Sequence, residues 1–158
     1  MVFGDRDAGG GSVTSLTIER LGKDLTALED ALLAAQLPID DLQEPDRLFF
    51  RFKEDADLVA FAGLEGRGPN RLIRSIVVVE ERRNSGLGRD IISSLETLAH
   101  DIGVSTLHLL TTDAAPFFAR LGYAVCDRAA APAAIAMSRE FAGLCPASAI
   151  YMVKELRR

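Results

Sequence analysis

Several features are scarce in this 158-residue sequence, and each scarcity excludes a class of protein. There are two cysteines, Cys126 and Cys145, which are too few for a disulfide scaffold and favour a reduced, cytoplasmic setting. No apolar run approaches the roughly 20 residues that span a bilayer, so no membrane partner is expected. The net charge of −5 argues against a nucleic-acid partner, because binding a phosphate backbone needs a basic face.

The first residues also lack a hydrophobic segment. Residues 1–12 contain charged residues and the run Gly9-Gly10-Gly11, so they do not resemble a secretory signal. We expect residues 1–13 to form a flexible tail. Residues 14–158 show no internal repeat and no linker, and their length suits one domain with a substantial core.

The most informative stretch is residues 76–89. It begins with an apolar, β-branched run that predicts a buried strand, and it ends in a basic turn with two glycines. An amphipathic helix is predicted next, because five apolar residues share one helical face: Leu87, Ile91, Leu95, Leu98 and Ile102. The first N–H groups of such a helix have no intrahelical acceptor and attract anions. Gly86 and Gly88 allow close approach, so we expect a diphosphate here.

The glycines alone do not identify the ligand. The lysine of a Walker loop is missing, and only two of the three glycines of the dinucleotide fingerprint are present. The segment Arg83-Asn84-Ser85-Gly86-Leu87-Gly88 instead matches the arginine/glutamine-x-x-glycine-x-glycine/alanine signature of the GCN5-related N-acetyltransferases (GNAT proteins). Downstream, residues 114–123 resemble the second hallmark of that family. The alternative is an unrelated α/β domain whose strand-to-helix turn needs glycines.

The rest of the pattern predicts a mixed α/β domain. Strands are expected at residues 15–20, 47–53, 58–64, 72–79, 105–110, 123–126 and 149–153. Helices are expected from an Asp24 N-cap to Pro38, from Leu87 to a stop at Gly103, after a cap at Thr112 or Asp113 to Gly122, and from Pro132 to Phe141. Tight connections favour antiparallel pairing of strands two to four. The helical crossover makes strands four and five parallel.

The resemblance to GNAT proteins covers roughly residues 16–156. It implies their fold, a mostly antiparallel sheet flanked by helices and splayed between strands four and five, with acetyl-coenzyme A in the splay as co-substrate. The residues that it implies for the pantetheine arm, the diphosphate and the thioester end are Ile76, Val77, Val78, Arg83, Asn84, Ser85, Gly86, Leu87, Gly88, Arg89, Thr112 and Phe117. The implied reaction is attack of an amine on the thioester, with the enzyme positioning the reactants and polarising the carbonyl.

One departure from the family bears on catalysis. Many GNAT enzymes carry a tyrosine that can protonate the leaving thiolate, and this chain has Phe118 there. The thiolate then leaves unassisted or through water, another group supplies the proton, or the domain is a weak catalyst. Tyr123 falls at a position where the family places an aromatic core residue. The catalytic residues therefore stay unassigned.

Arg74 is the candidate substrate-binding residue. It lies inside an apolar strand, where a charge needs a partner. It would clamp a carboxylate or another oxyanion, or it faces solvent or pairs with a neighbour such as Glu65. The acidic residues between Asp40 and Asp46 either attract an amine or form a solvated loop. We expect His100 at the surface and His108 at the edge of the core.

The C-terminal third resembles one GNAT branch in particular. Residues 131–135 and 141–149 look like small acetyltransferase-like proteins linked to bacterial arsenic-resistance operons. The resemblance implies acetylation of a small-molecule amine, an amino-acid-like toxin in that setting. The alternative is a non-catalytic acyl-coenzyme A-binding or thiol-based metalloid-responsive protein, in which Cys126 or Cys145 would act. Otherwise both cysteines are small hydrophobic residues. No metal site is predicted, and a homodimer through residues 149–153 is a further expectation.

Overall fold

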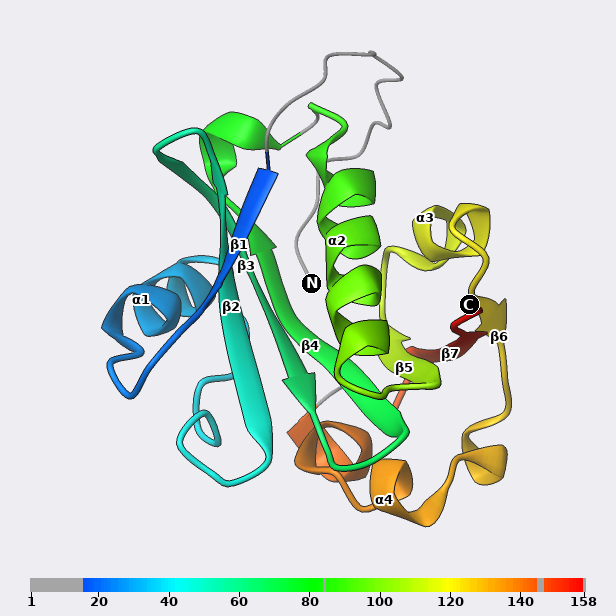
Figure 1. Cartoon of the computed structure of the whole chain (residues 1–158). Helices are drawn as coiled ribbons and strands as arrows, with labels where there is room; N and C mark the ends of the chain where they lie inside the picture. Colours follow the sequence, from blue (N-terminus) through cyan, green and yellow to red (C-terminus); the bar gives the residue numbers. More distant parts are fainter. Residues whose placement is uncertain (1–15, 84, 145–146, 158) are drawn as a thin grey trace.

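The computed structural model describes residues 16–83, 85–144 and 147–157. These residues form one seven-stranded sheet in the order β1-β2-β3-β4-β5-β7-β6, with helices on both faces (Figure 1). The expected tail at residues 1–13, together with Asn84 and Cys145, lies outside the described residues. All neighbouring strands are antiparallel except β4 and β5, which are parallel. The predicted fold class is therefore confirmed.

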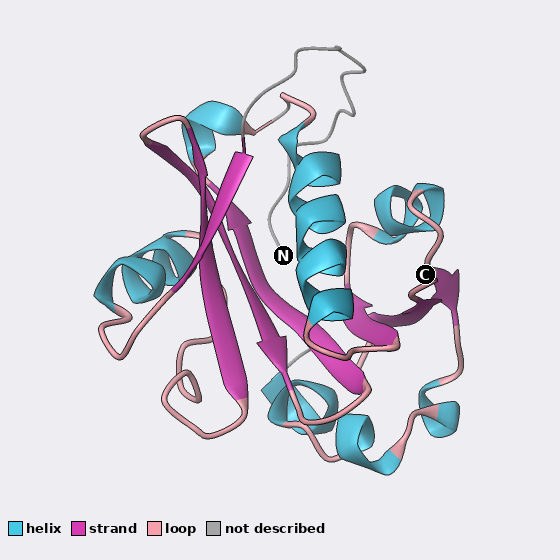
Figure 2. Ribbon diagram, in the orientation of Figure 1, coloured by secondary structure: helices cyan, strands magenta, loops and turns pink. Residues whose placement is uncertain are grey.

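Figure 2 shows the secondary structure along the chain. The strands are β1 (Leu16–Arg20), β2 (Arg47–Glu54), β3 (Asp57–Glu65), β4 (Asn70–Val78), β5 (Thr106–Thr111), β6 (Ala124–Val125) and β7 (Ile150–Glu155). The helices are α1 (Thr26–Ala34), α2 (Leu87–Asp101), α3 (Ala115–Arg120) and α4 (Ala133–Ala136). Short helical turns are η1 (Glu80–Arg82), η2 (Arg128–Ala130) and the π-helical η3 (Glu140–Leu144).

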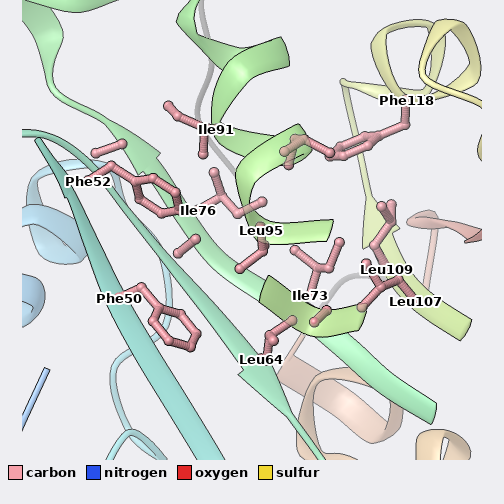
Figure 3. Close-up of a cluster of buried hydrophobic side chains, with 14 of the residues drawn as sticks. Phe50, Phe52, Leu64, Ile73, Ile76, Ile91, Leu95, Leu107, Leu109 and Phe118 are labelled. Atoms are coloured by element: carbon pink, nitrogen blue, oxygen red, sulfur yellow. The ribbon is translucent and has the colours of Figure 1, made fainter. Parts of the chain in front are cut away.

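The main hydrophobic core lies between the sheet and α2 (Figure 3). The helical spacing places Ile91 and Leu95 on the buried side of α2, where they meet Ile73 and Ile76 of β4. Each such side chain contributes roughly 1.5–3 kcal/mol when it is fully buried. Ile102, predicted on the same face, is 45% exposed, because the helix ends at Asp101. The core therefore fixes α2 against the strand that precedes it.

The opposite face of the sheet carries two smaller hydrophobic clusters. One lies under α1 and includes Leu28 and Val77, and the other lies under α4 and includes Leu72 and Ile135. Arg74 sits on β4 between Leu72 and Val77, and it is buried with a relative exposure of 1%. A buried charged side chain therefore lies at the boundary between two apolar clusters.

Three predicted helix boundaries differ from the structure. Helix α1 begins at Thr26, and Asp24 Oδ1 accepts a hydrogen bond from Thr26 N at 3.0 Å. It is Thr111, not Thr112 or Asp113, whose hydroxyl accepts from Ala114 N at the start of α3. The single helix predicted from Pro132 to Phe141 is instead two pieces, α4 and η3. Helices this short gain little from their own hydrogen bonds, so tertiary packing decides their limits.

Candidate active site

Strands β4 and β5 separate soon after they begin. They pair only over Asn70–Leu72 and Thr106–His108. Further along, Val77 and Val78 pair with β3 on one side, and within the described chain no strand pairs with their other side. The backbone groups of Ile76–Val78 on that side therefore face the opening between the strands. An extended ligand can hydrogen-bond there as an added strand would.

A bulge in β4 lies beside this opening. Ser75 and Ile76 together oppose the single residue Ala62 of β3, and Ser75 has a left-handed φ of 56°. A bulge turns the neighbouring peptide groups out of the regular ladder, and a left-handed φ is costly for a residue other than glycine. Such strain persists only where the surroundings impose it. The surrounding structure therefore imposes the bulge, which lies in β4 just after the last residue that pairs with β5.

The glycine turn after β4 leads directly into α2. Gly86 is the N-cap residue with a φ of 82°, and among the described residues no side chain caps the helix. The N–H groups of the first turn of α2 are therefore available to an anion. Arg89 lies exposed on this turn. Arg83 instead folds back, and its Nε donates to Val78 O at 2.8 Å.

The two residues expected near the thioester lie just before α3 and in its first turn. Thr112 is exposed, whereas Phe117 is half-buried against the main core and makes an edge contact with Phe118 at 5.2 Å between ring centroids. Phe118 is fully buried. The hydroxyl of Tyr123 donates to Glu96 Oε2 at 3.0 Å, and burial raises the pKa of Tyr123 above its usual value. This geometry agrees with a core role for Tyr123.

Arg74 is held by the chain's own carboxylates. Its guanidinium donates to both Asp41 oxygens, at 2.5 and 2.6 Å, and to Glu65 Oε1 at 2.7 Å. Burial opposes ionisation of Asp41, but hydrogen bonds from Arg74 and Arg47 lower the pKa of Asp41 to about 2. The pairing with Glu65 that the sequence left open is present. A substrate oxyanion would have to displace Asp41, so contact between Arg74 and substrate stays a prediction.

Sequence reasoning missed Glu140, which completes this group. Its Oε1 lies 3.6 Å from Arg74 Nε, and the residue is 7% exposed. Burial raises the pKa of Glu140 to about 7 against the attraction of Arg74, and the charges of Glu65 and Asp41 add to the rise. A lone glutamate in an alanine-rich segment carries no local signal, because only the fold places it beside β4.

The acidic segment before β2 is not a solvated loop throughout. Asp41 is fully buried. Glu44 pairs with Arg139 at 2.8 Å, and Asp46 pairs with Arg67 at 2.6 Å. The segment is thereby tied to the turn before β4 and to the residues just before η3, and Asp41 ties it to β4 through Arg74.

His108 lies in a hydrogen-bonded row at the base of the opening. Its Nε2 faces Asn70 Oδ1 at 2.8 Å, and its Nδ1 faces the Tyr151 hydroxyl at 2.7 Å. An amide oxygen only accepts, so Nε2 carries the proton and Nδ1 accepts from Tyr151. Burial lowers the pKa of His108, which keeps the ring neutral. In the part of the chain that the structure describes, no group of potential ligands could hold a metal ion.

The sheet splays beside a helix N-terminus that no described side chain caps. This arrangement defines an α/β domain that can hold a ligand with an extended arm and an anionic group. The acetyltransferase (GNAT) domain family matches residues 45–125, just over half of the chain. The chain belongs to this family. An uncharacterized N-acetyltransferase of Chlorobaculum tepidum is 41% identical over 51 residues, which are 32% of each chain.

Solved structures of several acetyltransferases share the fold. N-acetylglutamate synthase of Neisseria gonorrhoeae, complexed with coenzyme A and N-acetyl-glutamate, has a TM-score of 0.74 at 18% identity, over 93% of this chain and 36% of that one. A GNAT acetyltransferase of Staphylococcus aureus has a TM-score of 0.69 at 15% identity, over 90% and 100%. The ribosomal-protein-S18-alanine N-acetyltransferase of Escherichia coli has a TM-score of 0.65 at 20% identity, over 91% and 96%. The chain thus spans about a third of the first relative in each comparison.

None of its described helices is both long and apolar enough to cross a membrane.

Proposed function

We propose that this protein transfers the acetyl group of acetyl-coenzyme A to the amine of a small molecule. The observation that carries the proposal is the open edge of β4, which leads from the bulge at Ser75 to the N-terminus of α2, where no described side chain forms a cap. One extended cofactor can use both features, with its pantetheine arm along Ile76–Val78 and its diphosphate at Gly86–Arg89. Membership of the acetyltransferase family supports the same assignment.

The residues present can support an acyl transfer by positioning. Acetyl-coenzyme A supplies an activated acetyl thioester. Backbone groups of β4 fix the arm of the cofactor, and a peptide N–H beside the bulge polarises the thioester carbonyl. The first turn of α2 balances the diphosphate charge. Phe118 has no proton to give, so the departing sulfur takes its proton from water or from another group.

The acceptor belongs to the proposal as well. The likeness of residues 131–135 and 141–149 to the arsenic-resistance branch supports an amino-acid-like toxin as substrate, handled in the cytoplasm. Release of free thiol from acetyl-coenzyme A, measured over a panel of amines that includes amino-acid-like arsenicals, tests this. Turnover with at least one amine is expected. Failure of every amine while coenzyme A still binds contradicts the transferase assignment.

Replacing Gly86 with valine tests the cofactor site. Valine at this position must adopt the left-handed backbone φ of Gly86, which is costly for a residue with a side chain. Its side chain would also project where the diphosphate is expected. We expect coenzyme A affinity, measured by calorimetry, to fall about tenfold or more, which corresponds to about 1.4 kcal/mol or more. Gly103→Val is the matched control, because Gly103 has a φ of 94° at the other end of α2 with open space around it. An equal loss of coenzyme A affinity in both variants would contradict a diphosphate site at Gly86.

A second function is favoured by one observation, the buried Phe118 in the place of a proton donor. The fold then binds acyl-coenzyme A without turnover and responds to metalloids through a thiol at Cys126, which is partly buried, or at Cys145. Arsenite titration of the wild type, Cys126→Ser and Cys145→Ser distinguishes the two functions. Equal arsenite affinity in all three proteins rejects the thiol-based function.

A further inference from the structure

Glu140 stands apart from the other carboxylates around Arg74. It opens η3, in the orange segment that Figure 1 shows next to the start of β4. Its side chain is 9% exposed, so more than nine-tenths of it is buried. Arg74, Asp41 and Glu65 surround it from β4, from the segment before β2 and from β3. Glu140 thus places a carboxylate from the C-terminal third of the chain one side chain away from the bulge.

The hydrogen bonds of Arg74 are already used by other groups. Its two terminal nitrogens donate to Asp41 and Glu65, and its Nε donates to Ser75 Oγ at 3.2 Å. Glu140 Oε1 is 3.6 Å from that Nε, which is beyond hydrogen-bonding distance. Among the described residues, no donor forms a hydrogen bond with the Glu140 carboxylate. Burial makes an ionised carboxylate unfavourable unless it accepts hydrogen bonds, so a ligand that brings a donor to Glu140 would stabilise its charged form.

We propose that Glu140 binds the ammonium group of the acceptor and then takes its proton. This inference rests on the proposed acetyl transfer and names the chemical class of the acceptor, a primary amine that arrives protonated. The ammonium gives one proton to the Glu140 carboxylate, and the neutral nitrogen attacks the thioester carbon. The new C–N bond forms as the C–S bond breaks. The thiolate leaves and becomes a thiol with the second proton of the nitrogen.

The neighbouring charges explain why this role falls to Glu140. Both Asp41 oxygens accept hydrogen bonds from Arg74 or Arg47, and Glu65 Oε1 accepts one from Arg74, whereas Glu140 accepts none from a described residue. Arg139, next to Glu140 in the chain, points to Glu44 instead. Burial raises the pKa of Glu140 to about 7, so near neutral pH the group can both lose and accept a proton. A base whose pKa lies near the working pH is the most effective.

Coenzyme A thioethers test the ammonium site without knowledge of the natural acceptor. One series carries a primary amine on a tether of two, three or four carbons, and a matched series ends in methyl. We expect the wild type to bind one aminoalkyl thioether about tenfold more tightly than its alkyl counterpart, as for a hydrogen bond to a charged group. Glu140→Gln should abolish this preference and keep affinity for coenzyme A itself.

The control variant is Glu44→Gln, which removes one negative charge from a side chain that is 42% exposed. It should keep the preference. Equal binding of the aminoalkyl and alkyl series by the wild type, or an unchanged preference in Glu140→Gln, overturns the inference. Failure of the wild type to bind coenzyme A at all contradicts the proposed cofactor site instead, so the two failures are distinguishable.

The pH dependence of turnover supplies a readout that a merely structural role would not give. With an amine that the wild type acetylates, kcat/KM should rise through about pH 7 as Glu140 ionises. Glu140→Gln should lose that rise and fall roughly 10²–10⁴-fold at neutral pH. Its remaining rate should increase with the fraction of free amine and approach the wild type at high pH. A variant profile parallel to the wild type would assign Glu140 a packing role only.

Discussion

Arg74 links four parts of the chain through one side chain. Its guanidinium joins β4 to β3 through Glu65, to the segment before β2 through Asp41 and to η3 through Glu140. Buried charges are tolerated only when they are paired, and removal of one partner exposes the cost of the others. Arg74 therefore matters most for the carboxylates that it holds in place on the side of the sheet opposite α2.

Replacement of Arg74 by methionine should destabilise the protein strongly. Three buried carboxylates would lose their contact with Arg74, only Asp41 would keep a hydrogen bond from Arg47, and breaking a buried pair costs about 3–5 kcal/mol. Urea unfolding at pH 7 measures the free energy of unfolding. Arg67→Met is the matched control, since its side chain is 80% exposed beside Asp46 and such pairs contribute about 1 kcal/mol or less. Similar losses in the two variants would show that the Arg74 cluster is not a stabilising feature.

Glu140→Gln should change the dependence of stability on pH. The pKa of Glu140 is raised from 4.5 to about 7 by burial, despite Arg74. A carboxyl with a raised folded-state pKa favours folding below pH 4.5, and this contribution is lost as pH rises through about 7. Above pH 7 the glutamine variant should therefore have a higher free energy of unfolding than the wild type, by up to about 3 kcal/mol, and should unfold at a higher temperature. The difference should vanish below pH 4.5, and its absence at pH 8 would contradict the raised pKa.

Packing between β2, β3 and β4 leaves room for only a hydrogen at Gly63. A Cβ there would lie 2.7 Å from Phe49 Cδ1 and 3.3 Å from Arg74 Cγ. Phe49 is buried with an exposure of 4%, and the Arg74 side chain is fixed by its ion pairs. The centre of the Arg74 guanidinium lies 6.0 Å from the centroid of the Phe49 ring. Gly63, on the strand between them, leaves the space that both side chains occupy.

Gly63→Ala should therefore lower the free energy of unfolding. Overpacking of a closed site costs about 1–3 kcal/mol, and the shift of Phe49 would also disturb Arg74. Gly22→Ala is the control, because no atom lies within 4 Å of its added Cβ. Its effect should stay within about 0.5 kcal/mol. Denaturant midpoints compare the two, and equal midpoints would show that the sheet adapts at Gly63.

Cofactor binding should stabilise the folded protein as a unit, because the proposed site joins β4, α2 and the start of α3. A ligand that binds only the folded state adds about 2.7 kcal/mol at a free concentration one hundred times its Kd. Thermal unfolding with and without coenzyme A measures this gain. The Gly86→Val variant at the same coenzyme A concentration should show a smaller gain. A wild-type transition that coenzyme A leaves unchanged would contradict binding to the folded state.

The strand–turn–helix unit was predictable because its signals are local. The β-branched run before Glu80, the glycine at residue 86 and the apolar spacing of α2 each report on neighbours a few residues away. Their physical causes, strand sterics, positive φ and helical periodicity, act within one element. The parallel arrangement of β4 and β5 follows from the crossover helix between them.

The amino-acid sequence by itself determined the fold class, the parallel pair of strands β4 and β5 and the expected place for a diphosphate, because patterning and backbone preferences are local properties. Only the tertiary structure decided what surrounds Arg74. Asp41, Glu65 and Glu140 are far apart along the chain and carry no shared pattern, and folding brings them to one buried point. Burial there, which no spacing encodes, strengthens their pairing with Arg74 and shifts the pKa of Glu140.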